Sequence, residues 1–141
     1  MQSLKWPILA SGLLMAGGLS WLIKIAVIVA TDGRVMTTGP AALLMSAGLV
    51  LLPLGAAGLG AWLARRTHVV VRALAALAAV GALMACSVAL GIGASALVRG
   101  RGPAYWAEEA GILAAGLLWG TVGAAALVRA GRTGATGGSL S

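Results

Sequence analysis

The sequence predicts an all-α membrane protein in which four transmembrane helices form a bundle. Hydrophobic residues make up 60% of the 141 residues and charged residues only 9%, whereas charged residues reach about 25% in soluble domains. Four apolar segments alternate with short connections, and each segment exceeds the ~20 helical residues that cross a bilayer. None shows the period-two alternation of a barrel strand, and a bilayer leaves only helices or closed barrels.

The predicted spans cover residues 7–30, 40–64, 70–97 and 104–128, within a single domain of residues 1–130. The first segment is longer than the ~7–15-residue apolar region of a signal peptide and lacks a clean small-x-small cleavage site before Thr31, so we expect a retained helix. Pro7, Pro40 and Pro103 mark helix starts, where a missing N–H removes no hydrogen bond. After the last span, the stretch GRTGATGGSLS at 131–141 predicts a flexible Gly/Ser/Thr-rich tail.

The distribution of basic residues predicts the orientation of the helices. Six lie on the side of the two termini and three on the other side: Lys5, Arg65, Arg66, Arg72, Arg129 and Arg132 against Arg34, Arg99 and Arg101. Because Lys and Arg collect on the cytoplasmic side, we expect a multi-pass protein of the cell (inner) membrane with both termini in the cytoplasm.

The second and fourth spans suggest an internal 2+2 duplication. When residues 39–66 are laid on residues 102–129 without gaps, nine positions are identical, including the start Gly-Pro-Ala and the arginines Arg66 and Arg129. Bias toward Ala, Gly and Leu alone would produce several such matches, so the repeat stays one of two interpretations. Both halves would have the same orientation, because each contains two spans.

Lys24 is the charged residue that the architecture must accommodate, because it lies within the first span. One interpretation is snorkelling, in which the ammonium group reaches the interface about 9 Å away. The other is an ion pair with the fourth span, since Glu109 lies at a similar depth and shares a helical face with Gly116 and Gly120. Glu108 is the second candidate acid. Pairing would offset the cost of burying either charge alone.

Such a pair has a structural and a functional interpretation. In the structural one it sets the register of the first and fourth helices. In the functional one it lies in an outward-facing polar vestibule with Ser20, Trp21, Asp32 and Tyr105, where a cation could bind or a proton move. Trp106 and Tyr105 also suit the aromatic belt of a membrane interface.

Several function classes have little support in the sequence. The net charge of +7 is explained by basic residues that flank spans and meet anionic headgroups, so we expect the lipid bilayer and no nucleic acid as partner. One cysteine, Cys86, and one histidine, His68, provide no thiol pair and no metal or haem site. We therefore expect no enzymatic activity, no catalytic residues and no cofactor or metal.

The stretches WLIKIAVIVATDGR at 21–34 and RGPAYWAEEAGIL at 101–113 resemble small four-span membrane proteins of GC-rich actinobacteria. The resemblance implies a four-span fold and no activity that transfers to individual residues. The leading functional prediction is a structural or accessory membrane protein, alone, as a homo-oligomer or with a membrane protein partner. The alternative is a small homo-oligomeric transporter or channel with an outward-facing site at Lys24 and Glu109.

Overall fold

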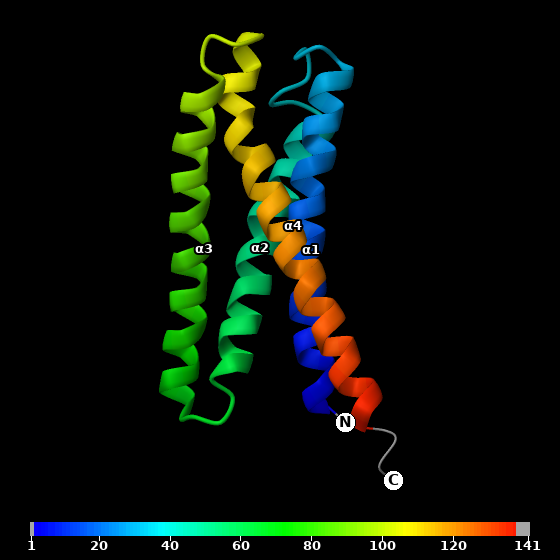
Figure 1. The fold of residues 1–141 in the computed structure, drawn as a ribbon, viewed down its shortest axis with the longest axis vertical. Coiled ribbons are helices and arrows are strands. Elements are labelled where there is room, and N and C mark those ends of the chain that lie inside the picture. Colours follow the sequence, from blue (N-terminus) through cyan, green and yellow to red (C-terminus); the bar gives the residue numbers. More distant parts are fainter. Residues whose placement is uncertain (1, 138–141) are drawn as a thin grey trace.

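The computed structural model describes residues 2–137, with side chains from residue 5 to residue 135. The chain forms four helices that run alternately up and down, so that the two ends of the described chain lie at the same end of the molecule (Figure 1). They are α1 (Gln2–Ala30), α2 (Pro40–Leu63), α3 (Val69–Val98) and α4 (Ala104–Gly137). All four are long and apolar enough to cross a membrane, which confirms the predicted fold class.

Two helix ends differ from the prediction. The first helix begins at Gln2, so Pro7 lies inside it, where its missing N–H removes one backbone hydrogen bond. The fourth helix continues to Gly137, so residues 131–137 are helical where we expected a flexible tail; residues 138–141 lie outside the described part. Adding a residue to an existing helix requires fixing only that residue. In addition, the Thr133 hydroxyl donates to the backbone carbonyls of Arg129 and Ala130, at 3.3 and 3.0 Å.

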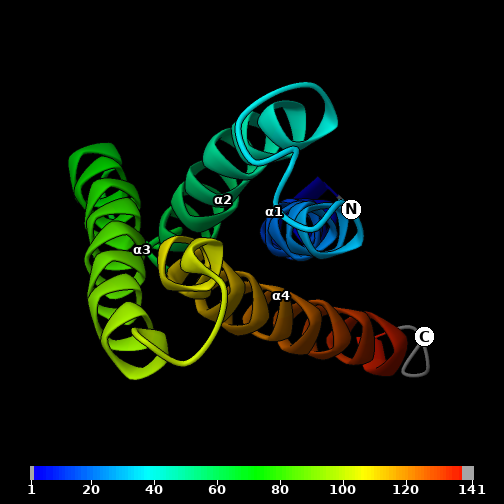
Figure 2. The ribbon, with the colours of Figure 1, turned by 90° about the horizontal axis from the view of Figure 1, so that it is seen from above.

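The helices form a ring of neighbours in which α1 and α3 each pack against α2 and α4. Seen from above, α3 lies on the far side of α2 and α4 from α1 (Figure 2). A duplicated helix pair would give this order, but so would any ring of four antiparallel helices. The internal duplication therefore stays a prediction.

Glycines bring α1 and α4 into backbone contact. A Cβ atom added to Gly18 would lie 2.7 Å from the Cα atom of Gly120 and 2.9 Å from the carbonyl oxygen of Gly116. In lipid, helices associate through such close contacts because bilayer tails are as apolar as leucine. The Gly116 and Gly120 pair thus packs within the chain against α1.

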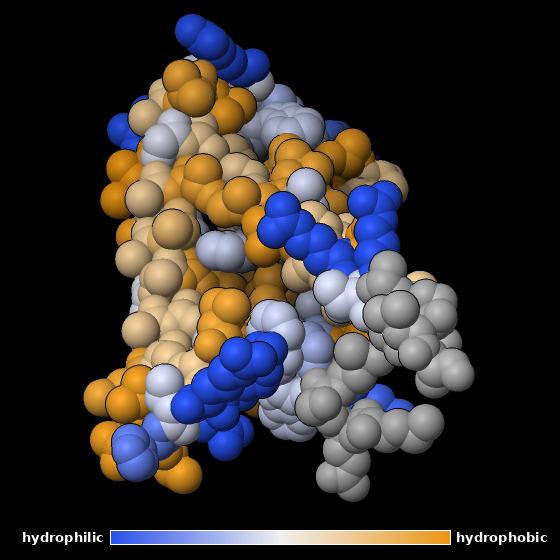
Figure 3. Space-filling view, turned by 60° about the horizontal axis from the view of Figure 1, so that its bottom comes forward, coloured by the Kyte–Doolittle hydropathy of each residue, from blue (hydrophilic) through white to orange (hydrophobic). Residues whose placement is uncertain are grey.

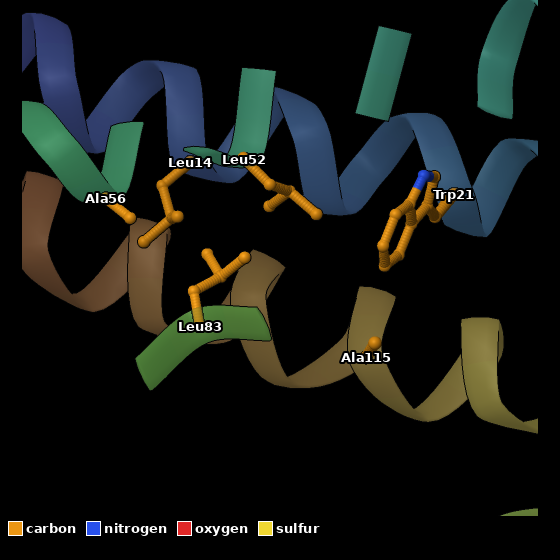
Figure 4. Packing of buried hydrophobic residues seen from close by; sticks show 6 residues of the cluster. All are labelled: Leu14, Trp21, Leu52, Ala56, Leu83 and Ala115. Carbon is orange, nitrogen blue, oxygen red and sulfur yellow. The ribbon is translucent and has the colours of Figure 1, made fainter. Parts of the chain in front are cut away.

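A small hydrophobic cluster lies where the helices meet. Each helix contributes to it, α1 and α2 with two residues and α3 and α4 with one (Figure 4): Leu14, Trp21, Leu52, Ala56, Leu83 and Ala115. Leu52 is fully buried, and Leu83 is the one buried residue on α3. The core therefore centres on α1, with α3 attached at its edge.

Candidate functional site

Lys24 on α1 and Glu109 on α4 form a buried ion pair. The ammonium nitrogen Nζ of Lys24 lies 2.9 Å from Oε1 and 2.8 Å from Oε2 of Glu109. Only 4% of Lys24 and 7% of Glu109 is exposed. Lys24 thus directs its charge into the protein and does not snorkel along the lipid-facing surface.

The antiparallel course of α1 and α4 explains why these two residues meet. Lys24 precedes the end of α1 at Ala30 by six residues, and Glu109 follows the start of α4 at Ala104 by five. At 1.5 Å per residue, both lie roughly 8–9 Å from the same end of the bundle. The close approach at Gly18 then allows a lysine and a glutamate to span the remaining gap between the helix axes.

The ammonium and carboxylate groups fulfil much of each other's hydrogen-bonding capacity. A lysine ammonium has three N–H donors and no acceptor, and an ionised carboxylate is only an acceptor. Here one ammonium donates to both oxygens of one carboxylate. The result is a locally neutral pair, which is the form in which ionisable side chains are tolerated within a membrane.

Glu108, the second candidate acid, lies outside this contact. Its side chain is exposed, because adjacent residues in a helix point about 100° apart and Glu109 occupies the inward position. Asp32, the third acid of the chain, is exposed in the turn after α1, where it has a φ of 50°. The structure therefore selects Glu109 from the three acids.

The residues expected to line a polar vestibule each contact other groups. The Ser20 hydroxyl donates to the carbonyl of Ala16 at 2.9 Å, and the indole N–H of Trp21 donates to the carbonyl of Met45 at 3.4 Å. Tyr105 lies against Gly33 and stacks on Trp106, with 5.9 Å between the ring centroids.

The ion pair also lies apart from the three described cavities. Neither Lys24 nor Glu109 lines any of them, and all three are lined by residues from the other half of the bundle. At the ion pair, side chains of α1 and α4 are in direct contact.

Two polar features were not predicted from the sequence. The indole N–H of Trp119 on α4 donates to the Ser87 hydroxyl on α3 at 2.9 Å, and this hydroxyl donates to the carbonyl of Leu83 at 2.8 Å. Ser11 on α1 is fully buried, and its hydroxyl has no hydrogen-bond partner. A serine within an apolar helix was the available signal, but serines usually bond to their own helix backbone.

Comparisons with models of known protein families, with curated proteins and with solved structures gave no match. The resemblance of residues 21–34 and 101–113 to small actinobacterial membrane proteins therefore stays a prediction. Any functional conclusion depends on the geometry of the chain itself.

Proposed function

We propose that the protein is a structural or accessory component of the cell (inner) membrane, with no catalytic activity of its own. The observation that carries this proposal is the Lys24–Glu109 pair, whose charges are compensated and shielded within the chain. In this role the pair joins α1 to α4 in one register. A shift by a single residue would turn Glu109 away from α1 and leave both charges unpaired in an apolar surrounding.

The burial of the pair favours this role over the transporter alternative. A site that carries a cation or proton must exchange with water on at least one side. On the loop side of the pair, one turn beyond Lys24 on the same helix face, Ile28 is only 1% exposed. One turn before Glu109, Tyr105 contacts Gly33 in the loop that follows α1. These residues support a closed contact.

The proposed orientation places both termini in the cytoplasm. Six basic residues lie at the end of the bundle that carries the termini. The other end has three besides the paired Lys24, together with all three acids. Juxtamembrane Lys and Arg are retained on the cytoplasmic side during insertion.

Flux measurements in reconstituted liposomes test this proposal. The purified chain is compared with a Lys24→Met/Glu109→Leu variant and with protein-free liposomes, using pH-sensitive and potassium-sensitive dyes under an imposed gradient. We expect the wild type and the variant to leak no faster than protein-free liposomes.

Flux above the protein-free rate that disappears in the folded Lys24→Met/Glu109→Leu variant would instead establish the ion pair as part of a conduction path. Circular dichroism and elution of both proteins as a single detergent-solubilised species serve as the control for folding.

A further inference from the structure

A cavity of about 660 Å³ lies between α1, α2 and α4, in the half of the bundle that carries the termini. Its walls come from one face of each helix and are mostly apolar, with Leu59 on α2 and Val122 and Ala126 on α4. Its volume falls within the ~300–1,000 Å³ of ordinary ligand sites. The walls therefore suit an apolar chain and offer little to a small polar solute.

Ser11 provides a polar group in this mostly apolar lining. It is fully buried, and its hydroxyl is the one buried side-chain polar atom without a hydrogen-bond partner among the described residues. Leaving such a group without a partner costs free energy that a bound ligand with a hydrogen-bonding oxygen would recover. By helix rise, Ser11 lies roughly 20 Å along α1 from Lys24, so the two polar sites are separate.

The rim of the cavity is basic and aromatic. Arg129 on α4 lines the cavity with an exposed side chain, and Trp62 lines it from α2. The guanidinium carbon of Arg65 lies 4.3 Å from the centroid of the Trp62 ring. Figure 3 turns this end of the molecule toward the reader and shows hydrophilic side chains next to hydrophobic surface.

The charged side chains at this end of the molecule are all basic. The chain contains three acids, and all of them lie near the opposite end of the bundle, whereas Lys5, Arg66 and Arg129 belong to this end. An anionic group at the rim therefore meets no Asp or Glu side chain. Tryptophan and arginine at this depth also coincide with the headgroup level of a bilayer.

We propose that this cavity binds one anionic phospholipid of the surrounding leaflet. An acyl chain occupies the apolar space against Leu59, Val122 and Ala126, and the phosphate lies at the rim next to Arg129. In the lipid-bound state the Ser11 side chain, which is fully buried in this structure, rotates toward the cavity, and its hydroxyl donates to an ester carbonyl oxygen of the lipid. Basic pockets between transmembrane helices on the cytoplasmic side are suited to anionic headgroups. This site is independent of the proposed function of the ion pair.

Native mass spectrometry of the purified chain, with lipids of identical acyl chains, tests the proposal. The probes are phosphatidylglycerol, phosphatidylcholine and inorganic phosphate. We expect one phosphatidylglycerol to be retained in preference to phosphatidylcholine, and no binding of inorganic phosphate at the same concentration. The Arg129→Gln variant should bind phosphatidylglycerol about fivefold more weakly, the effect expected for one basic residue near a lipid surface.

The matched control is Arg66→Gln, which removes the same charge from the same end but does not line the cavity. Equal weakening by both variants would overturn the site, because it would show diffuse attraction to the basic end. Equal retention of the two lipids would overturn the headgroup assignment.

Two further variants test the cavity itself. Ala126→Phe fills the apolar space and should abolish retention, and Ser11→Ala should weaken it while leaving the helical content unchanged. If Ala126→Phe does not fold, the comparison of Arg129→Gln with Arg66→Gln still decides between a site and diffuse attraction. Retention of phosphatidylglycerol by a folded Ala126→Phe variant at the wild-type level would overturn the proposal.

Discussion

α1 and α3 are nearly equal in length and hydropathy, but the bundle uses them differently. Their apolar windows have mean hydropathies of 2.1 and 2.3, yet 39% of the α1 window is buried in protein and only 6% of the α3 window. Gly18 of α1 lies at a backbone contact with α4, and Gly17 lies against Leu52 of α2. On α3, Gly91 lies against Gly111 of α4, but an added Cβ at Gly81 or Gly93 would meet nothing within 4 Å. α1 also carries the charge that needs a partner, Lys24.

This difference shows that hydropathy places a helix in the membrane but does not place it in the centre of a bundle. Leucine and valine gain little when they exchange a lipid neighbour for a protein neighbour. Close contact at glycines and the pairing of polar groups supply what apolar area cannot. α1 has both features on the faces toward its neighbours. α3 has close contacts at Gly60 of α2 and Gly111 of α4, together with Leu83 and Ser87, but no buried charge.

Breaking the ion pair of α1 should have the largest effect on the free energy of unfolding. Lys24→Met or Glu109→Gln alone leaves a buried partner unpaired, and we expect a loss of about 3–5 kcal/mol in the free energy of unfolding. The combined variant should lose markedly less than the sum, with a coupling of at least about 1 kcal/mol. Unfolding in detergent micelles, followed by circular dichroism, measures these values.

Glu108→Gln provides the control for the ion pair, because it removes a neighbouring but exposed charge. We expect it to stay within about 0.5 kcal/mol of the wild type. Purely additive effects of the Lys24 and Glu109 substitutions would contradict the energetic role of the contact.

The four spans follow from the length of the apolar segments, whereas the Lys24–Glu109 contact was one of two interpretations, beside snorkelling, and was based on counting residues from the helix ends. Depth along an antiparallel helix pair follows from rise per residue, and the shared face with Gly116 follows from helical periodicity. Both quantities are properties of single helices. That is why Glu109 could be preferred over Glu108 before the packing was known.

Features that depend on how whole helices cross could not be predicted in this way. The vestibule around Ser20 and Asp32 was inferred from depth alone, but Ser20 bonds to its own helix and Asp32 is exposed. The cavity at Ser11 and the Trp119–Ser87 bond require knowing how α4 crosses its neighbours. The end of α4 was placed by composition, although Gly and Thr at 131–137 continue the helix.

Adding a methyl group at the α1–α4 contact should have the next largest effect. In Gly18→Ala, the new Cβ would overlap backbone atoms of Gly120 and Gly116, which cannot move independently of α4. We expect a loss of about 1–3 kcal/mol in the free energy of unfolding, as for other overpacked sites. The same substitution at Gly81 of α3 meets open space.

Gly81→Ala should therefore leave the free energy of unfolding unchanged or raise it by up to about 1 kcal/mol, because alanine has a higher helix propensity than glycine. The two variants are measured side by side in the same detergent. A similar loss at both positions would show that the exposed face of α3 is covered in the folded protein, and the contrast between α1 and α3 would fail.

The smallest expected effect on stability comes from the hydrogen bond between Trp119 on α4 and Ser87 on α3. Ser87→Ala removes the acceptor of the Trp119 indole N–H, whereas Ser46→Ala on α2 removes a serine that bonds only to the Ala42 carbonyl of its own helix, at 3.0 Å. Hydrogen bonds between membrane helices average about 0.6 kcal/mol, so we expect a loss of that order in the free energy of unfolding for Ser87→Ala and a smaller loss for Ser46→Ala.

The Trp119→Phe background tests this prediction, because Ser87→Ala should lower the free energy of unfolding by less once the indole donor is gone. If Ser87→Ala costs the same with and without Trp119, the bond adds nothing to the attachment of α3, which would then depend on Leu83 and the contacts at Gly60 and Gly111.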